Sequence, residues 1–174
     1  MAKKLSKVKS TKKKTKTMKI PNVGSTAPDF NLPDPELNMK SLVDYKDKKV
    51  VLAFFPASMS PVCTKEMCTF RDSFQELNDV EAQVVAVSID GPFANKQFTE
   101  MYNLNFPVLS DYARDAVNKY GVVMPDLLHV KQYNAAKRSI FVIDSNRTVR
   151  YKWVSDSPLI EPNYEEIKQI IRTI

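Results

Sequence analysis

Two short runs of apolar residues mark the centre of the predicted fold. The first run covers Val50 to Phe55 and is closed by Pro56, and the second covers Ala82 to Asp90. Both are rich in β-branched side chains and have the length of a strand that is buried on both faces. A predicted helix separates them, and a second helical stretch, Phe93 to Tyr102, follows Gly91-Pro92. This alternation predicts a parallel pair of strands joined by a right-handed crossover.

The helix between the two runs has a clear start signal. Ser60 can serve as its N-cap and Pro61 as its first residue, because a proline there gives up only an N–H that would stay unpaired. Cys63 therefore lies in the first turn, at the carboxyl edge of the sheet, where unpaired N–H groups and the positive end of the helix dipole stabilise a thiolate. Spacings of four and three place this thiol on the sheltered, apolar stripe of the helix, which consists of Cys63, Met67, Phe70, Phe74 and Leu77.

The remaining elements are short. Prolines at positions 21, 28, 33 and 35 divide Ile20 to Asp44 into extended pieces, with at most a strand or a small hairpin near Asp29 to Leu32. Val122 to Ala136 shows no clear period, and an irregular segment of this length often covers a site or a partner. Two elements follow Tyr102: a strand Phe106–Ser110 and a helix Ala113–Tyr120, which Asp111 caps and Gly121 ends. After the irregular segment, the sequence predicts a hairpin of two strands, Arg138–Asp144 and Thr148–Val154. The last predicted element is a helix Pro162–Ile174, whose buried face consists of Tyr164, Ile167, Ile170 and Ile171.

Composition and charge bound the class of protein. The chain has 174 residues, of which 43% are hydrophobic and 26% charged, and this suits one globular domain with a proper core. The net charge of +6 is misleading, because nine lysines and no acidic residue lie within residues 1–19, while the rest of the chain carries −3. We therefore expect residues 1–19 to be a disordered basic tail and residues 20–174 to form the domain. A solvated extension is the favoured interpretation of the tail, and attraction to nucleic acid is the alternative.

Targeting segments and metal sites are not evident in the sequence. No stretch approaches the ~18 apolar residues of a membrane span, and the basic N-terminus lacks the apolar centre of a signal peptide. We expect a cytoplasmic protein without membrane contact. Two cysteines are too few for a disulfide scaffold, so reactive or inert thiols remain the alternatives. Two cysteines and one histidine, His129, cannot supply a four-ligand zinc site, and neither a metal nor a cofactor is expected.

The segment around Cys63 carries a specific motif. Pro56, Ser60 and Cys63 have the spacing Pro-x-x-x-Thr/Ser-x-x-Cys, and a second cysteine follows five residues later. This pattern resembles the active-site region of the peroxiredoxins, in particular their bacterioferritin-comigratory protein or peroxiredoxin Q subgroup. Far downstream, Lys137-Arg138-Ser-Ile-Phe-Val-Ile-Asp144 is similar to the strand that carries an arginine in this family. The resemblance extends over residues 20–174 and implies an α/β domain with the thioredoxin-like fold, a central mixed β-sheet flanked by helices.

Peroxide reduction needs a thiolate, a group that holds the hydroperoxide in line with it, and positive charge where the leaving oxygen becomes an alkoxide. The resemblance implies that Cys63 is the peroxidatic nucleophile and that Arg138 supplies the charge beside it. Ser60 offers a hydroxyl to the peroxide, backbone N–H groups of the first turn assist, and Pro56 shields the pocket from water. Glu66 resembles a family glutamate and is expected to orient Arg138 without touching the peroxide, while a solvated carboxylate is the alternative.

Cys68 is the candidate resolving cysteine, because a sulfenic acid on Cys63 condenses with a nearby thiol to a disulfide and water. In an ideal helix, residues five apart have Cα atoms ~8.7 Å apart, beyond the ~7 Å that a disulfide tolerates. The first turns must therefore unwind, which exposes the disulfide to an external thioredoxin-like dithiol. A buried bystander is the alternative interpretation of Cys68. Arg71 is a weaker candidate for the site, since a surface salt bridge explains it equally well.

The resulting hypothesis is a thiol-dependent peroxidase that reduces hydrogen peroxide and organic hydroperoxides through a cysteine sulfenic acid, resolved by an intramolecular disulfide. It acts as a monomer or homodimer, with a thioredoxin-like or other dithiol reductant as its partner. A thiol–disulfide oxidoreductase is the rival of the same class, but it normally carries Cys-x-x-Cys at the helix start. A nucleic-acid or membrane-surface binder acting through the lysine tail is the rival of another class, and removal of residues 1–19 would distinguish it.

Overall fold

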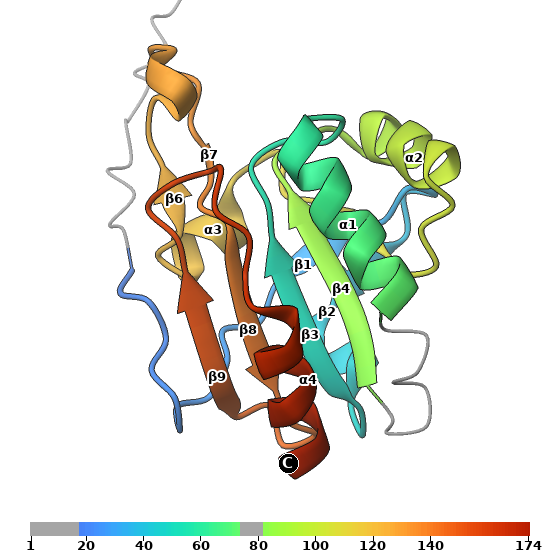
Figure 1. Ribbon diagram of the computed structural model, residues 1–174, viewed down its shortest axis with the longest axis vertical. Helices are drawn as coiled ribbons and strands as arrows, with labels where there is room; N and C mark the ends of the chain where they lie inside the picture. The colour runs from blue at the N-terminus through green and yellow to red at the C-terminus, as the bar shows by residue number, and fades with distance from the viewer. Residues whose placement is uncertain (1–17, 74–81) are drawn as a thin grey trace, which may run out of the picture.

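A five-stranded sheet forms the centre of the molecule (Figure 1). The computed structural model describes residues 18–73 and 82–174. The strands of this sheet are β3 (Lys49–Phe54), β4 (Ala82–Ser88), β5 (Val108–Ser110), β8 (Ser139–Ile143) and β9 (Val149–Val154). Their order is β5-β4-β3-β8-β9, in which β4 pairs parallel with β3 and β5, whereas β8 pairs antiparallel with β3 and β9. The predicted parallel pair, the predicted hairpin and the mixed sheet are therefore confirmed.

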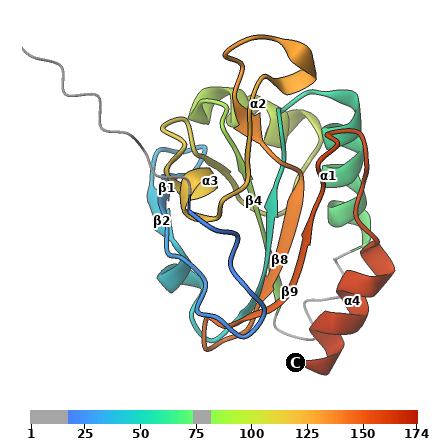
Figure 2. The same ribbon diagram turned by 90° about the vertical axis from the view of Figure 1, so that its left-hand side faces the viewer.

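Both faces of the sheet are covered (Figure 2). Three helices pack on one face, namely α1 (Pro61–Ser73), α2 (Pro92–Met101) and α4 (Tyr164–Thr173). The other face carries α3 (Asp115–Lys119), the 3-10 helix η1 (Leu42–Tyr45) and an antiparallel hairpin of β1 (Asn31–Pro33) with β2 (Met39–Ser41). Successive side chains of β3 point to opposite cores, so Val51 and Ala53 face α1 while Val50 and Leu52 face β1. This explains the uninterrupted apolar run that predicted a doubly buried strand.

Residues 122–136 differ from the predicted irregular loop. Within them, β6 (Val123–Met124) and β7 (Ala135–Ala136) pair antiparallel and enclose the 3-10 helix η3 (Leu127–His129). Strands of two residues are too short to show an alternating pattern, which is why the sequence did not predict them. We call residues 123–136 the η3 hairpin. It projects beyond the carboxyl ends of the parallel strands and is drawn in orange in Figures 1 and 2.

Two helix starts lie two residues later than predicted, and local capping decides both. The helix α3 begins at Asp115, because Arg114 has a left-handed backbone with φ of 59°. The carboxylate of Asp111 accepts a hydrogen bond from the N–H of Asp115 at 2.7 Å, so Asp111 caps this helix as predicted. The helix α4 begins at Tyr164, preceded by Asn163, whose side chain accepts from a backbone N–H of the first turn.

Some predictions concern residues that the structure does not describe. The predicted tail lies outside the described residues except for Met18 and Lys19, and so do Phe74 and Leu77 of the predicted apolar stripe. Within residues 18–73 and 82–174, no helix is long and apolar enough to span a membrane. The described members of the stripe are all fully buried against the sheet, namely Cys63, Met67 and Phe70.

Candidate active site

Cys63 lies in the first turn of α1 at the carboxyl edge of the sheet, as the sequence predicted. The strand β3 ends at Phe54, and the chain crosses a short loop before it enters α1 at Pro61. The thiol is completely buried in the core that α1 shares with the sheet. Its sulfur accepts a hydrogen bond from Nη2 of Arg138, with a distance of 3.3 Å between the two atoms. A cation therefore lies directly against the sulfur, where it stabilises a thiolate.

Arg138 reaches this position through the sheet. It immediately precedes β8, whose Ser139 is the register partner of Phe54 at the carboxyl end of β3. Its Nη1 donates to Oε2 of Glu66, and its Nη2 donates also to the carbonyl oxygen of Pro158 at 2.7 Å. The whole residue is inaccessible to solvent. The contacts with Glu66 and Pro158 thus fix the orientation of the guanidinium toward the sulfur.

Glu66 lies one turn after Cys63 on α1 and is fully buried. The alternative interpretation of Glu66 as a solvated carboxylate is therefore wrong. Burial raises the pKa of Glu66 to about 7, and the opposing charge of Arg138 does not cancel this effect. The second carboxylate oxygen, Oε1, has no hydrogen-bond partner among the described residues. Near neutral pH, Glu66 can therefore hold a proton while remaining beside Arg138.

Pro56 and Ser60 lie in the loop between β3 and α1. Pro56 is buried, and Ser60 immediately precedes the helix, where its carbonyl oxygen accepts from the N–H of Thr64 at 2.8 Å. The hydroxyl of Ser60 donates to the carbonyl oxygen of Ala57 at 3.1 Å. Its oxygen lone pairs remain free to accept from a bound molecule, because that bond uses only the hydroxyl hydrogen.

A pocket of about 100 Å³, which we call the peroxide pocket, opens over Cys63. Its polar side chains are those of Ser60, Cys63 and Arg138, and Pro56 lies in its wall, so the structure brings these four predicted residues together. The other residues of the wall were not predicted from the sequence. The η3 hairpin contributes Leu127 and Leu128, the connection between β9 and α4 contributes Pro158 and Leu159, and the loop and helix start contribute Ala57, Pro61 and Val62.

A buried polar network, also missed from the sequence, holds the loop in front of α1. The N–H of Ser58 donates to Oδ2 of Asp90 at 2.7 Å, and the hydroxyl of Ser58 donates to Oδ1 of Asn95 at 2.7 Å. Asn95 is fully buried on α2 and donates to the carbonyl oxygen of Leu109 at 3.2 Å. The sequence signal that could have indicated this network is Asn95, a polar residue on the inner face of a predicted helix. The network fixes the loop that presents Ser60 and Pro56.

Cys68 and Arg71 lie outside the peroxide pocket. Both cysteines are free thiols on the intact helix α1, and Cys68 is half-buried. Arg71 donates to the carbonyl oxygen of Tyr102 and pairs with Asp72, which agrees with the surface salt bridge and not with a place for Arg71 in the site. The structure therefore brings neither Cys68 nor Arg71 to the sulfur of Cys63.

The single histidine does not line the peroxide pocket. His129 is exposed on η3. Among the side chains that the structure describes, no group of three or more His, Cys, Asp and Glu residues is arranged to hold a metal ion. The polar side chains that line the peroxide pocket supply a thiol, a hydroxyl and a guanidinium.

The amino-acid sequence is similar to known proteins over a range that includes the residues of this site. A family model described as the AhpC/TSA family matches residues 23–152, a range that includes Cys63, Cys68 and Arg138. A peroxiredoxin named bcp from Coxiella burnetii is 39% identical over 131 residues, which are 75% of this chain and 87% of the relative. The chloroplastic peroxiredoxin Q of Gentiana triflora is 36% identical over 127 residues, which are 73% of this chain and 56% of the relative.

Solved structures that resemble this chain carry similar names. The chain resembles peroxidoxin BcpB from Mycobacterium tuberculosis with a TM-score of 0.76 and 34% identity, covering 87% of this chain and 97% of that one. It resembles a peroxiredoxin-like protein from Aquifex aeolicus with a TM-score of 0.79 and 30% identity, covering 88% of each chain.

Proposed function

The chain belongs to the AhpC/TSA family and is a peroxiredoxin, and on this basis we propose that it reduces hydrogen peroxide and organic hydroperoxides with Cys63 as the peroxidatic thiol. The observation that carries the proposal is the hydrogen bond of 3.3 Å between Arg138 and the sulfur of Cys63 at the peroxide pocket. A buried thiol with a fixed cation against it is suited to act as a thiolate nucleophile.

In the first step, the thiolate of Cys63 attacks the terminal oxygen of the hydroperoxide, the one that carries the hydrogen. A sulfur–oxygen bond forms, the oxygen–oxygen bond breaks, and the departing alkoxide or hydroxide takes up a proton. The products are a sulfenic acid on Cys63 and an alcohol or water. The guanidinium of Arg138 and the N–H groups at the start of α1 stabilise the negative charge on the leaving oxygen.

The other pocket residues hold the substrate. The hydroxyl oxygen of Ser60 accepts a hydrogen bond from the hydroperoxide, and Pro56 excludes water from the oxygen–oxygen bond. Glu66 is a positioning residue, because it contacts Arg138 and has no place in the pocket lining. The full burial of both charged side chains supports this assignment.

In the second step, the thiol of Cys68 attacks the sulfur of the sulfenic acid, so that a disulfide forms and water leaves. Both cysteines lie on one helix, five residues apart, so α1 must open around Cys63 before the sulfurs can meet. A thioredoxin-like dithiol then reduces the disulfide and becomes oxidised itself. The proposed setting is the cytoplasm, where such reductants keep thiols reduced, and the proposed catalytic unit is residues 20–174.

Replacement of the nucleophile tests the proposal. The variant Cys63→Ser should consume no hydrogen peroxide with either dithiothreitol or a thioredoxin system as electron donor, while its circular dichroism spectrum stays that of the wild type. The matched variant Cys68→Ser should still give a sulfenic acid on Cys63, detected by mass spectrometry after trapping with dimedone. Turnover that survives in Cys63→Ser would overturn the assignment.

A further inference from the structure

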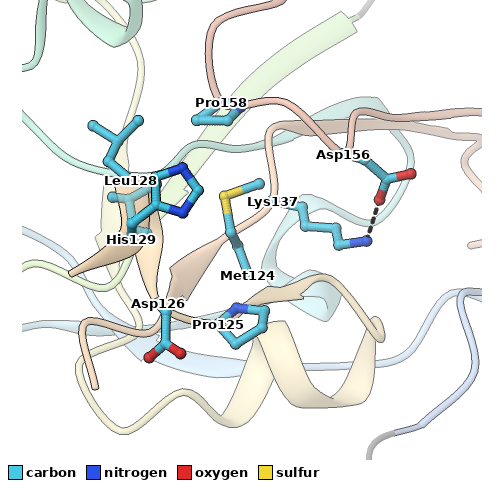
Figure 3. Close-up of a pocket in the computed structure, with 9 residues that line it drawn as sticks. Met124, Pro125, Asp126, Leu128, His129, Lys137, Asp156 and Pro158 are labelled. Carbon is cyan, nitrogen blue, oxygen red and sulfur yellow. Dashed lines mark hydrogen bonds and ion pairs between the residues drawn. The ribbon is translucent and has the colours of Figure 1, made fainter. Parts of the chain in front are cut away.

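The peroxide pocket shares a wall with a second, larger cavity. This second cavity, which we call the η3 pocket, has a volume of about 420 Å³ and lies between the η3 hairpin and the β9–α4 connection (Figure 3). Leu127, Leu128 and Pro158 line both cavities. In Figure 3, Leu128 and His129 lie on one side of the η3 pocket, and the ion pair of Lys137 with Asp156 lies on the other. The three shared residues therefore form the partition between the two cavities.

The peroxide pocket is larger and less polar than hydrogen peroxide requires. Eight of its eleven lining residues are apolar, and its volume of about 100 Å³ is several times the ~10–15 Å³ that a cavity needs to hold one water molecule. The oxygen–oxygen bond of a substrate occupies only the end near Cys63 and Arg138. The remaining space faces Leu127, Leu128, Pro158 and Leu159, which offer no hydrogen bonds from their side chains. Such a surface suits carbon atoms.

Leu128 stands out within this wall. It has a left-handed backbone with φ of 52°, although leucine adopts this conformation rarely, and its side chain is 63% exposed. Neighbouring contacts hold the hairpin in this shape, because the N–H of Leu127 donates to the carbonyl oxygen of Tyr133 at 2.8 Å and Nε of Arg114 donates to that of Asn134 at 3.0 Å. Backbone strain at a pocket wall persists only when its surroundings enforce it.

We propose that the apolar wall formed by Leu127, Leu128, Pro158 and Leu159 binds the carbon substituent of an organic hydroperoxide and that Leu128 sets the preference for such substrates over hydrogen peroxide. The hydroperoxy group lies at Cys63, the first carbons pack against Leu128, and longer substituents extend past the partition toward the η3 pocket. This inference rests on the proposed peroxidase function and deepens it. It assigns substrate selection to a hairpin whose residues take no part in the chemical step.

The test compares two substrates in the same protein. Stopped-flow oxidation of Cys63 gives the second-order rate constants for cumene hydroperoxide and for hydrogen peroxide, and the ratio of the two is the readout. In Leu128→Ala this ratio should fall about ten-fold, because the lost methyl groups no longer contact the substituent. Leu159→Ala, on the β9–α4 connection, should also lower the ratio. Both side chains are 63% exposed, so neither change threatens the fold.

Val130→Ala is the matched control. Val130 lies on the same hairpin, is 56% exposed and lines neither cavity. Its substitution should leave the ratio within about two-fold of the wild type. A ratio that is unchanged in Leu128→Ala, or that falls equally in Val130→Ala, overturns the inference. The peroxidase proposal is tested separately, by whether the wild type reacts with hydrogen peroxide at all. That result does not depend on the ratio of the two rate constants.

Discussion

At the scale of single residues, the guanidinium of Arg138 links all the charged chemistry of the site. A buried cation is costly unless its surroundings compensate it, and here Glu66, Cys63 and the Pro158 carbonyl do so. The carboxylate and the thiolate therefore compete for one positive charge. Because burial raises the pKa of Glu66, this carboxyl group can be neutral when Cys63 is the anion.

We predict that Arg138→Met slows the oxidation of Cys63 by hydrogen peroxide more than ten-fold. Methionine keeps much of the volume but removes a preorganised positive group, whose loss costs on the order of 2–4 kcal/mol of transition-state stabilisation. Stopped-flow kinetics measures the rate. Arg71→Met is the control, since Arg71 contacts Tyr102 and Asp72 and should leave the rate within about two-fold. Equal rates in the two variants would remove Arg138 from the catalytic step.

The raised pKa of Glu66 predicts a pH-dependent stability. The native protein retains a proton on Glu66 up to about pH 7, whereas the unfolded chain loses it near the ordinary value of 4.5. The native state thus binds more protons between these values, so the contribution of Glu66 to stability falls as pH rises through this window, by about 3 kcal/mol in total. Urea denaturation should show that the stability of the wild type relative to Glu66→Gln decreases between pH 4.5 and 7 and is constant above pH 8. A relative stability that rises with pH would contradict the burial effect.

At the scale of elements, α1 has two requirements that conflict. The intact helix buries Cys63 in its first turn, but it also separates the two thiols that the proposed second step joins in a disulfide. Phe70, further along the same helix, is fully buried and stacks edge-on with Tyr164 of α4 at 5.3 Å between ring centroids. This anchor suggests that opening involves the turns before Phe70, while α4 keeps its place.

Hydrogen exchange should report this opening. Amides of residues 63–70 should be protected in the dithiol form and exchange faster after one equivalent of hydrogen peroxide, because the disulfide holds the first turns unwound. Amides of α4 serve as the internal control and should not change. The variant Cys68→Ser should keep much of the protection after oxidation and should lose multiple turnover with a thioredoxin system. Two unlinked cysteines in oxidised wild-type protein, seen by mass spectrometry, would make Cys68 a core residue without a resolving role.

At the scale of the whole molecule, the antiparallel insertion of β8 beside β3 creates the site. Arg138 and Cys63 are 75 positions apart in the chain, and the register of β8 on β3 brings them together at one edge of the sheet. On the opposite face, the chain after Met18 crosses the end of α3 closely. A Cβ atom at Gly121 would overlap the carbonyl oxygen of Met18 and lie 2.9 Å from the backbone nitrogen of Ile20.

This close approach predicts that alanine destabilises the protein more at Gly121 than at Gly91. Gly121→Ala should lower the free energy of unfolding by about 1–3 kcal/mol, because Gly121 has φ of 65° and no room for a Cβ atom. Gly91→Ala should stay within about 0.5 kcal/mol of the wild type, since nothing lies within 4 Å of its Cβ position and its φ is −65°. Urea denaturation measures both. Similar losses in the two variants would show that the crossing at Gly121 is not a tight contact.

The sequence by itself determined the elements that carry a strong local signal. Apolar runs of strand length predicted β3 and β4, and the Ser60-Pro61 start placed Cys63 in the first turn of α1. These signals are local, because the period of side chains and the pairing of helix-end N–H groups depend on a few neighbouring residues. The resemblance of the motif added the roles of Arg138 and Glu66, which composition and spacing could not supply.

Features that depend on contacts between residues far apart in the sequence appear only in the folded protein. The tertiary structure buried Glu66 and thereby raised its pKa, it turned residues 122–136 into a hairpin, and it used that hairpin to wall the peroxide pocket. The strands β6 and β7 have two residues each, so no local pattern marks them. Leu127 and Leu128 line the peroxide pocket only because the folded chain brings the η3 hairpin to the same pocket as Pro158. Burial and pocket shape arise from packing between segments that are distant in the sequence, so local sequence patterns do not predict them.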